Sequence, residues 1–202
     1  MIENSKNVLF LEKVWNVLNK EYFESALSKP VITIQSSPKT FGHFTCDKVW
    51  NQGKTSQYEI NISAEYLNRS FEYICATMIH EMVHEYCAEN GIQDTSRNNV
   101  YHNKKFKEEA EKRDLVITYD KKIGWSVTEP TDKLKASIKK YFSEKELSGY
   151  RQHFESALIK KKSSTRKYVC PCCGMSVRAT KAVNIRCNDC DEMMVCENRD
   201  ED

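Results

Sequence analysis

Apolar positions recur at helical spacing in two stretches of the first half of the chain. The first stretch predicts an amphipathic helix that ends before Pro30, because its apolar residues return to one face every three or four positions. These positions are Val8, Leu11, Val14, Trp15, Leu18, Tyr22 and Phe23. The second stretch, residues 71–90, has the same period and lies between Ser70, a favoured N-cap residue, and Gly91, which is favoured just beyond a helix C-terminus. Both helices should pack one face against a core.

Between these helices the pattern changes to short runs rich in β-branched and aromatic residues. The runs VITIQ (31–35), GHFTCDKVW (42–50) and YEINI (58–62) are separated by turn formers such as Pro38 and Gly53, which predicts three strands of a small sheet. Residues 101–114 predict a further helix, and LVITY (115–119) and IGWSV (123–127) are β-like. Residues 1–130 therefore predict one α+β domain, with helices packed on a sheet of three or slightly more strands.

The rest of the chain has a different character. Residues 131–167 alternate Lys-rich and weakly helical sequence, which predicts a solvated helix followed by a linker. Residues 168–197 carry cysteines but are too few to build a hydrophobic core, so we expect this module to need a metal. Residues 198–202 form an acidic tail. The sequence thus predicts a main domain, a basic connector and a small metal-dependent module.

The overall net charge of +2 conceals a regional imbalance. Residues 131–186 contain fourteen Lys or Arg against four Asp or Glu, a net charge of +10, whereas residues 187–202 carry a net charge of −6. A basic stretch of this kind can neutralise phosphates, although charge runs are usually solvated surface. DNA is therefore a candidate partner through the connector and the cysteine module, and a solvated linker is the alternative.

The N-terminal sequence MIENSKNVLFLEKVW has no signal-peptide pattern, because its apolar run is short and is interrupted by Glu12 and Lys13. No stretch approaches the roughly 20 apolar residues that cross a bilayer. Five of the nine cysteines fall between residues 170 and 190, and in a reducing compartment such clustering favours metal ligation over disulfides. We expect a cytoplasmic protein without a membrane partner.

Residues 80–84 read HEMVH, the HExxH arrangement. Histidines four residues apart project from the same face of a helix, so His80 and His84 are candidate ligands of one zinc ion. Glu81 lies about 100° round the helix from His80, where its carboxylate can act as a general base. Because a five-residue pattern also occurs by chance, the alternative is two histidines that only pack or form hydrogen bonds.

A catalytic zinc ion usually has three protein ligands and one open position. His102 begins the next predicted helix and is the preferred third ligand, since the intervening loop is long enough to turn the chain back. A carboxylate on that helix is the alternative, with Glu108, Glu109 and Glu111 available, although interleaved lysines suggest ordinary charge pairs. His43 and His153 are weaker candidates.

Two CxxC pairs, Cys170 with Cys173 and Cys187 with Cys190, predict a second zinc site. Four thiolates close the tetrahedral coordination of zinc and leave no position for water, which is typical of a structural site. Cys172 makes the first pair ambiguous, but only Cys170 and Cys173 have the usual two-residue gap. A redox-active pair is the alternative, and the sequence lacks a thioredoxin-like context for it.

The run MIHEMVHEYCAENGIQDTSRNNVYHNKKFKEEAEKRDL (78–115) resembles the core of the SprT-like metallopeptidases, a family that includes the DNA-dependent protease Spartan. The similarity extends from the N-terminal helix through GHFT (42–45) and YEINIS (58–63) to Trp125, and includes the C-terminal ribbon. It implies a small zincin-like α+β metallopeptidase domain followed by a zinc ribbon. It also implies that His80, His84 and His102 bind the catalytic zinc ion and that Glu81 is catalytic.

Two positions depart from the family pattern. Asp114 stands before Leu115 where the resemblance leads us to expect Gly, and Asp tolerates the left-handed conformation at a mild cost. Asn103 follows the third histidine, where many relatives have Gly. This second departure leaves the ligand set intact and concerns the details of the substrate cleft.

These features predict a zinc-dependent peptidase with a protein substrate and two zinc ions, one catalytic and one structural. The resemblance to Spartan favours substrates that are associated with DNA or crosslinked to it. Tyr101 is a candidate for stabilising the oxyanion. The alternative is a non-catalytic nucleic-acid-binding or regulatory protein that works through its ribbon. The intact Glu81 argues against this alternative, because a scaffold needs no general base.

Overall fold

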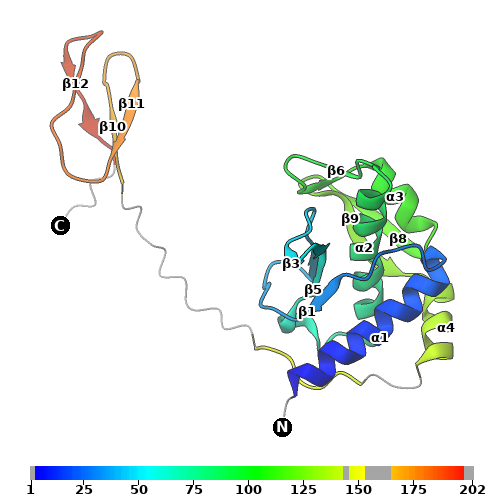
Figure 1. Ribbon diagram of the computed structural model, residues 1–202. Coiled ribbons are helices and arrows are strands. Elements are labelled where there is room, and N and C mark those ends of the chain that lie inside the picture. Colours follow the sequence, from blue (N-terminus) through cyan, green and yellow to red (C-terminus); the bar gives the residue numbers. More distant parts are fainter. Residues whose placement is uncertain (1–2, 143–145, 153–164, 198–202) are drawn as a thin grey trace. The chain divides into compact units, whose positions relative to one another are not determined.

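The computed structural model describes residues 3–142, 146–152 and 165–197. The chain forms two compact units, Met1–His153 and Phe154–Asp202 (Figure 1). We refer to them as the first unit and the ribbon. The residues 153–164 of the predicted linker, with His153 among them, and the acidic tail 198–202 lie outside the described residues.

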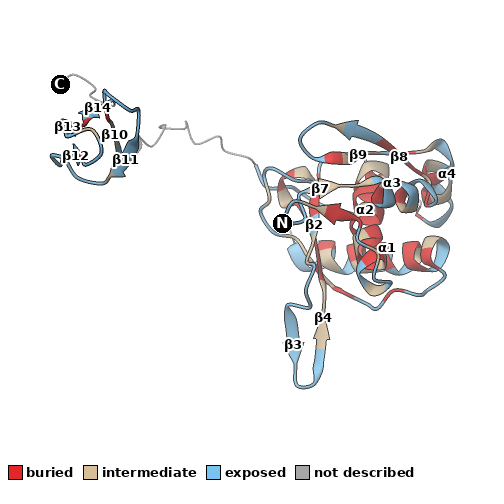
Figure 2. Ribbon diagram, turned by 90° about the horizontal axis from the view of Figure 1, so that it is seen from above, coloured by how far each residue is buried: buried red, intermediate tan, exposed pale blue. Residues whose placement is uncertain are grey.

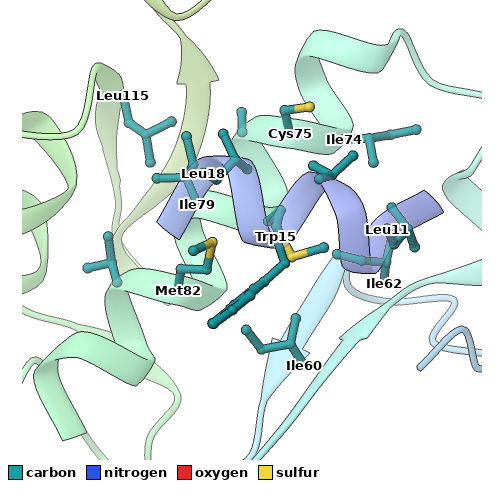
Figure 3. Packing of buried hydrophobic residues seen from close by; sticks show 14 of the residues in the cluster. Leu11, Trp15, Leu18, Ile60, Ile62, Ile74, Cys75, Ile79, Met82 and Leu115 are labelled. Atoms are coloured by element: carbon teal, nitrogen blue, oxygen red, sulfur yellow. The ribbon is translucent and has the colours of Figure 1, made fainter. Parts of the chain in front are cut away.

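Two long helices organise the core of the first unit. Helix α1 (Asn4–Phe23) and helix α2 (Phe71–Glu89) lie where the apolar periodicity predicts helices. Figure 3 shows Trp15 and Leu18 of α1 close to Ile79 and Met82 of α2, all of them buried. Burial of each such side chain stabilises the fold by about 1.5–3 kcal/mol, which explains why these two helices hold the unit together.

A three-stranded sheet packs against this helix pair. Its order is β1 (Val31–Thr33), β5 (Glu59–Ile62), β2 (Gly42–Phe44), with β1 parallel and β2 antiparallel to the central β5. The predicted strand 42–50 is divided into β2 and β3 (Trp50–Gln52). Strand β3 pairs instead with β4 (Thr55–Gln57) in a largely exposed hairpin that projects from the unit (Figure 2). One edge of β2 is therefore free of other strands within the described sheet.

A second, four-stranded sheet has the order β6-β7-β9-β8. Its strands are β6 (Thr95–Ser96), β7 (Tyr101–His102), β8 (Leu115–Asp120) and β9 (Gly124–Pro130). The prediction of a helix over 101–114 is wrong at its start, because helix α3 spans Lys104–Glu111 and follows β7. The side chain of Asn103 accepts hydrogen bonds from the backbone N–H groups of Lys105 and Phe106, which fixes the helix start after His102.

Gly124 permits the close approach of β7 and β9. The backbone N–H of His102 donates to the carbonyl oxygen of Ile123 at 2.9 Å. A Cβ atom at Gly124 would lie 2.1 Å from the carbonyl oxygen of His102, and Gly124 also has a φ angle of +76°. A side chain at this position would push His102 away, so this glycine fixes where the third histidine stands.

Helix α4 (Asp132–Tyr141) belongs to the first unit. Its residues Leu134 and Ile138, together with Phe142, are buried in the same core as α1 and α2. The solvated helix expected after Pro130 is therefore a packed helix, and the compact unit continues beyond residue 130. Arg151 and Ser148 extend this attachment, since Ser148 exchanges hydrogen bonds with Asn7 and the Arg151 backbone N–H donates to Ala64.

The ribbon is a small β structure with a minimal core. Strands β10 (Arg166–Val169), β11 (Ser176–Ala179) and β14 (Val195–Cys196) form one sheet, and β12 (Arg186–Cys187) pairs with β13 (Glu192–Met193). Its buried cluster consists of Tyr168, Cys170, Cys187 and Met194. The two units together confirm the α+β class. Among the described helices, none combines the length and the apolar character needed to cross a lipid bilayer.

Candidate metal centre

Three histidines from two elements converge in the first unit. His80 and His84 lie one turn apart on α2, and His102 is the last residue of β7. The Nε2 atoms of His80 and His102 are 3.2 Å apart, and those of His84 and His102 are 3.1 Å apart. Two nitrogen ligands of a tetrahedral zinc ion lie about 3.3 Å from each other, because each is about 2.0 Å from the metal. The spacing therefore suits zinc.

The hydrogen bonds behind the histidines determine where their protons lie. The Nδ1 atom of His84 lies 2.5 Å from a carboxylate oxygen of Asp94, and that of His102 lies 3.2 Å from the carbonyl oxygen of Ile123. Both partners are acceptors, so both Nδ1 atoms donate. Each neutral ring has one proton, and Nε2 is therefore left with a lone pair.

His80 has the same arrangement through a hydroxyl group. Its Nδ1 atom lies 2.8 Å from Oγ1 of Thr128, and this hydroxyl donates its own proton to the carbonyl oxygen of Ser126. Thr128 must therefore accept from His80. When the three rings are neutral, three Nε2 lone pairs thus face one point, which is an arrangement that suits a bound cation.

Burial keeps the rings of His80 and His102 free of a second proton. Desolvation holds the pKa of His80 well below its usual range and lowers the pKa of His102 to about 4. Phe106, which is fully buried on α3, supports all three rings, with its ring centroid 4.6 to 4.7 Å from each of theirs. The site is thus rigid and prepared for a metal before binding.

Glu81 lies on the same helix with its side chain 5% exposed. Burial raises the pKa of its carboxyl group to about 7, and a backbone hydrogen bond from Phe44 opposes this shift. A Cβ atom at Gly42 would lie 3.1 Å from Oε1 of Glu81 and 2.9 Å from the carbonyl oxygen of Asn61. The missing side chain at Gly42 therefore provides the space in which the Glu81 carboxyl group sits against β2.

The three histidines and Glu81 open into a cavity of about 690 Å³. One wall comes from the segment 39–44, and further lining comes from β9 and the loop before β7. Thr77 and Ala88 are the small residues of α2 that line it, whereas Ala76 and Cys87 are buried in the core. The cavity is large enough for part of a polypeptide chain.

Buried hydrogen bonds hold the segment that forms the first wall. Asn61 accepts from the backbone N–H of Gln35 at 2.7 Å, and Glu65 accepts from that of Ser37 at 3.0 Å. Hydrogen bonds from Ser36, Ser37 and Ser63 outweigh burial and lower the pKa of Glu65 to about 2. The wall is consequently fixed just before it reaches the cavity at residue 39.

The other candidates from the sequence lie away from the histidine cluster. Glu109 pairs with Arg113 and Lys112, and Glu111 lies 3.6 Å from Lys107, which are the ordinary charge pairs of a helix surface. His43 lines the cavity but does not belong to the cluster of three histidines. Tyr101 does not line the cavity, because its neighbour His102 does and side chains alternate along a strand.

Several groups that shape this site carried no sequence signal. Asp94, Thr128 and the carbonyl group of Ile123 orient the histidines, and Phe106 supports them. All of them reach the site through tertiary contacts. Asn103, by contrast, has a local role that can be recognised as an N-cap, and it lies outside the metal cavity.

The second group of possible ligands is in the ribbon. The thiols of Cys170, Cys173, Cys187 and Cys190 all lie within 4.8 Å of one another. The sulfur atoms of Cys173 and Cys187 are 3.8 Å apart, which equals the separation of about 3.8 Å expected for two thiolates on one tetrahedral zinc ion. Backbone N–H groups, chiefly that of Cys173, lower the pKa of Cys170 to about 7, which favours the thiolate that binds metal.

Cys172 is exposed and does not belong to this group of four. The turn of the first pair uses Gly174, whose φ angle is +73°. After the second pair, Asp191 takes the same left-handed conformation with a φ angle of 52°. Four thiols rather than two converge, which favours a closed metal site over a redox-active pair.

The departure at Asp114 behaves as expected from the sequence. Asp114 has a φ angle of 60°, which confirms the left-handed conformation. Its carbonyl oxygen accepts hydrogen bonds from the backbone and the side chain of Thr131, which caps α4. The residue thus joins the end of α3 to the start of α4.

Comparison with known proteins gives one match. A search of curated proteins found no match, and a search of solved structures found none either. The sequence pattern of the SprT-like family matches residues 11–124, which is more than half of the chain. This range contains the three converging histidines, Glu81 and Gly124. The chain therefore belongs to the SprT-like family.

Proposed function

We propose that this protein is a zinc-dependent peptidase, with His80, His84 and His102 as the ligands of the catalytic zinc ion. The observation that carries the proposal is the convergence of three histidine Nε2 atoms beside the buried carboxyl group of Glu81 in one cavity. A zinc ion held there supplies Lewis-acid catalysis, since it polarises a carbonyl group and acidifies a water molecule.

Glu81 acts as the general base in this proposal. A carboxylate oxygen of Glu81 accepts a proton from the attacking water and delivers it to the leaving amine nitrogen. Because burial raises its pKa to about 7, the group can both accept and release a proton near neutral pH. A helix surface carboxylate would be too acidic to return the proton efficiently.

The substrate that suits the cavity is an extended polypeptide. Strand β2 borders the cavity through Gly42 and Phe44 and has β5 on only one side. An extended chain can add to such an edge by backbone hydrogen bonds, which place a peptide carbonyl group beside Glu81. The exposed Phe41 and the half-buried Ile92 offer apolar contacts for its side chains.

The direct test is hydrolysis of an unfolded polypeptide by the full-length chain. We expect cleavage by the zinc-loaded protein and none after the metal has been removed, with recovery when zinc is returned. Fragments analysed by mass spectrometry would identify the bonds that are cut. Cleavage that survives complete removal of zinc would contradict the proposal, because no other group in the cavity replaces the metal's role.

The second part of the proposal is that the substrates are associated with DNA, which the connector and the ribbon bind. The net charge of +10 over residues 131–186 supports it. Within the ribbon, Arg186 pairs with Asp191 and Lys167 with Glu197. Arg178 and Lys181 are both exposed, and neither pairs with an acidic group among the described residues. These two residues are suitable phosphate contacts.

Binding to DNA should be strongly salt-dependent. For about four to six phosphate contacts, affinity for duplex DNA is expected to fall about 10²- to 10³-fold between about 50 and 200 mM salt, because each contact releases counterions. Fluorescence anisotropy with a labelled duplex measures this. Replacing Arg178 and Lys181 with alanine should weaken DNA binding and make the affinity less dependent on salt concentration. The matched control replaces Lys20 and Lys54 of the first unit with alanine and should leave both properties unchanged. Absence of binding at about 50 mM salt would contradict this part of the proposal.

A further inference from the structure

A row of three aromatic rings on the first unit has a cation at each end. The guanidinium group of Arg97 lies 4.6 Å from the ring centroid of Tyr101. The hydroxyl groups of Tyr101 and Tyr119 are 3.1 Å apart, and the rings of Tyr119 and Trp125 are 5.1 Å apart. At the other end, Nζ of Lys107 lies 4.2 Å from the Trp125 ring centroid.

The row borders a hollow of about 410 Å³, which we name the aromatic hollow. It is lined by Tyr101, Asn103, Lys104, Tyr119 and Trp125. None of these residues lines the metal cavity, although His102 and Ser126, their neighbours in sequence, do. Because side chains alternate along a strand, β7 and β9 present one set to the histidine site and the other to the aromatic hollow.

Tyr119 is the ring of this row that is open to a ligand. It is 46% exposed, and no cation lies over its ring among the described residues, in contrast to Tyr101 and Trp125. An exposed aromatic ring contributes little to the stability of the free protein. It stabilises a complex when a planar group of a ligand stacks on it. The open ring thus marks where a planar group would bind.

The surroundings of the hollow are mainly positive. Lys104 lines it and is exposed, and Arg97 and Lys107 lie at the ends of the row. Lys121 and Lys122 are exposed in the turn that joins β8 to β9. The Asp120 carboxylate accepts from the backbone N–H groups of Lys122 and Ile123, and Glu111 pairs with Lys107. A ligand that combines planar rings with negative charges is the chemical match.

We propose that the aromatic hollow binds single-stranded nucleic acid, with a base stacked on Tyr119 and the flanking phosphates near Arg97 and Lys104. Stacking on aromatic side chains together with a basic groove is how proteins hold single strands without sequence preference. Cations at both ends of the row favour a strand with several phosphates over a single nucleotide. This inference deepens the nucleic-acid part of the proposed function and places a contact on the unit that carries the histidines.

Tryptophan fluorescence provides a reporter for this site. The chain has three tryptophans, Trp15, Trp50 and Trp125, all in the first unit, and Trp15 is buried in the core. Titration of the full-length protein with a ten-residue oligothymidylate is expected to quench the emission. The quenching should persist in Trp50→Phe and disappear in Trp125→Phe. Since the ribbon has no tryptophan, binding there leaves this signal unchanged.

Variants of Tyr119 test the stacking itself. Tyr119→Ala should weaken binding of the oligothymidylate about 5- to 150-fold, as expected for the loss of one stacked base, whereas Tyr119→Phe should retain affinity within about twofold. Thr118→Ala, an exposed neighbour on the same strand, is the matched control and should bind like the unchanged protein. Thymidine monophosphate should bind far more weakly than the oligomer.

Three outcomes would overturn the proposal. The first is an unchanged affinity for the oligomer in a folded Tyr119→Ala protein. The second is quenching that persists in Trp125→Phe. The third is an unchanged affinity of Tyr119→Ala for the oligomer together with a raised KM for a polypeptide. The last would make the hollow a polypeptide subsite. The titration needs no peptide hydrolysis, so its failure is distinguishable from failure of the peptidase proposal.

Discussion

Replacing Glu81 with glutamine is expected to lower the rate of peptide hydrolysis by about 10²- to 10⁴-fold, the usual contribution of a general base. The amide has nearly the shape of the carboxyl group and fits the space beside Gly42. It cannot accept a proton from water, so the loss falls on the chemical step. Zinc content should stay the same, because the histidine Nε2 atoms alone converge as ligands in the described cavity.

Two measurements separate this loss from damage to the fold. Initial rates on an unfolded polypeptide give the activity, and elemental analysis gives zinc per chain. Glu89→Gln, on the same helix but outside the cavity, is the matched control and should keep both values. Hydrolysis by Glu81→Gln at the rate of the unchanged protein would remove Glu81 from the reaction, and loss of zinc would make it a ligand. Absence of hydrolysis in the unchanged protein would favour the non-catalytic alternative.

Local periodicity was sufficient to predict the helical half of the site. His80 and His84 are four residues apart within a stretch whose apolar pattern predicts a helix, so their common face follows from helix geometry. The α+β class followed from stretches of helical period and from short runs rich in β-branched and aromatic residues. The Asp114 conformation could also be predicted, because it depends only on the local backbone preference of one residue.

The other half of the site depends on contacts between distant residues. His102 was expected in a helix, yet it lies on β7, where its place is set by the pairing with β9 and the missing side chain at Gly124. No local pattern reveals that a glycine 22 residues later faces a histidine backbone. The N-cap role of Asn103 was the one local signal that could have ended the predicted helix after His102.

The connector shows how charge can conceal packing. One face of α4 is buried, although lysines surround its apolar residues in the sequence. The buried residues are Leu134 and Ile138, and Phe142 follows at the same interval of four. Such a stripe is narrow, and its helix buries only a few side chains, so its Lys-rich composition suggested a solvated helix. The burial becomes visible only when α2 and β9 supply the surface that the stripe covers.

The two groups of ligands differ in how readily they should release zinc. The histidine site opens into a cavity of about 690 Å³, so a chelator can reach it, whereas the four thiols of the ribbon would enclose a bound zinc ion. We expect a mild chelator to remove one zinc ion per chain and to abolish hydrolysis with it. The second zinc ion should leave only as the ribbon unfolds.

Single substitutions should assign each zinc ion to its site. His102→Ala is expected to halve the zinc content and leave the ribbon folded. Cys187→Ser should also halve the zinc content, but in this variant the ribbon should unfold. The buried cluster of the ribbon consists only of Tyr168, Cys170, Cys187 and Met194. So small a core cannot replace a structural zinc ion, which contributes about 10–16 kcal/mol to folding. Elemental analysis measures the zinc, and the dispersion of amide NMR signals reports on the ribbon. One zinc ion per chain in the unchanged protein, or loss of both ions at the same chelator concentration, would contradict two sites of different character, because an open and a closed coordination shell should not release zinc together.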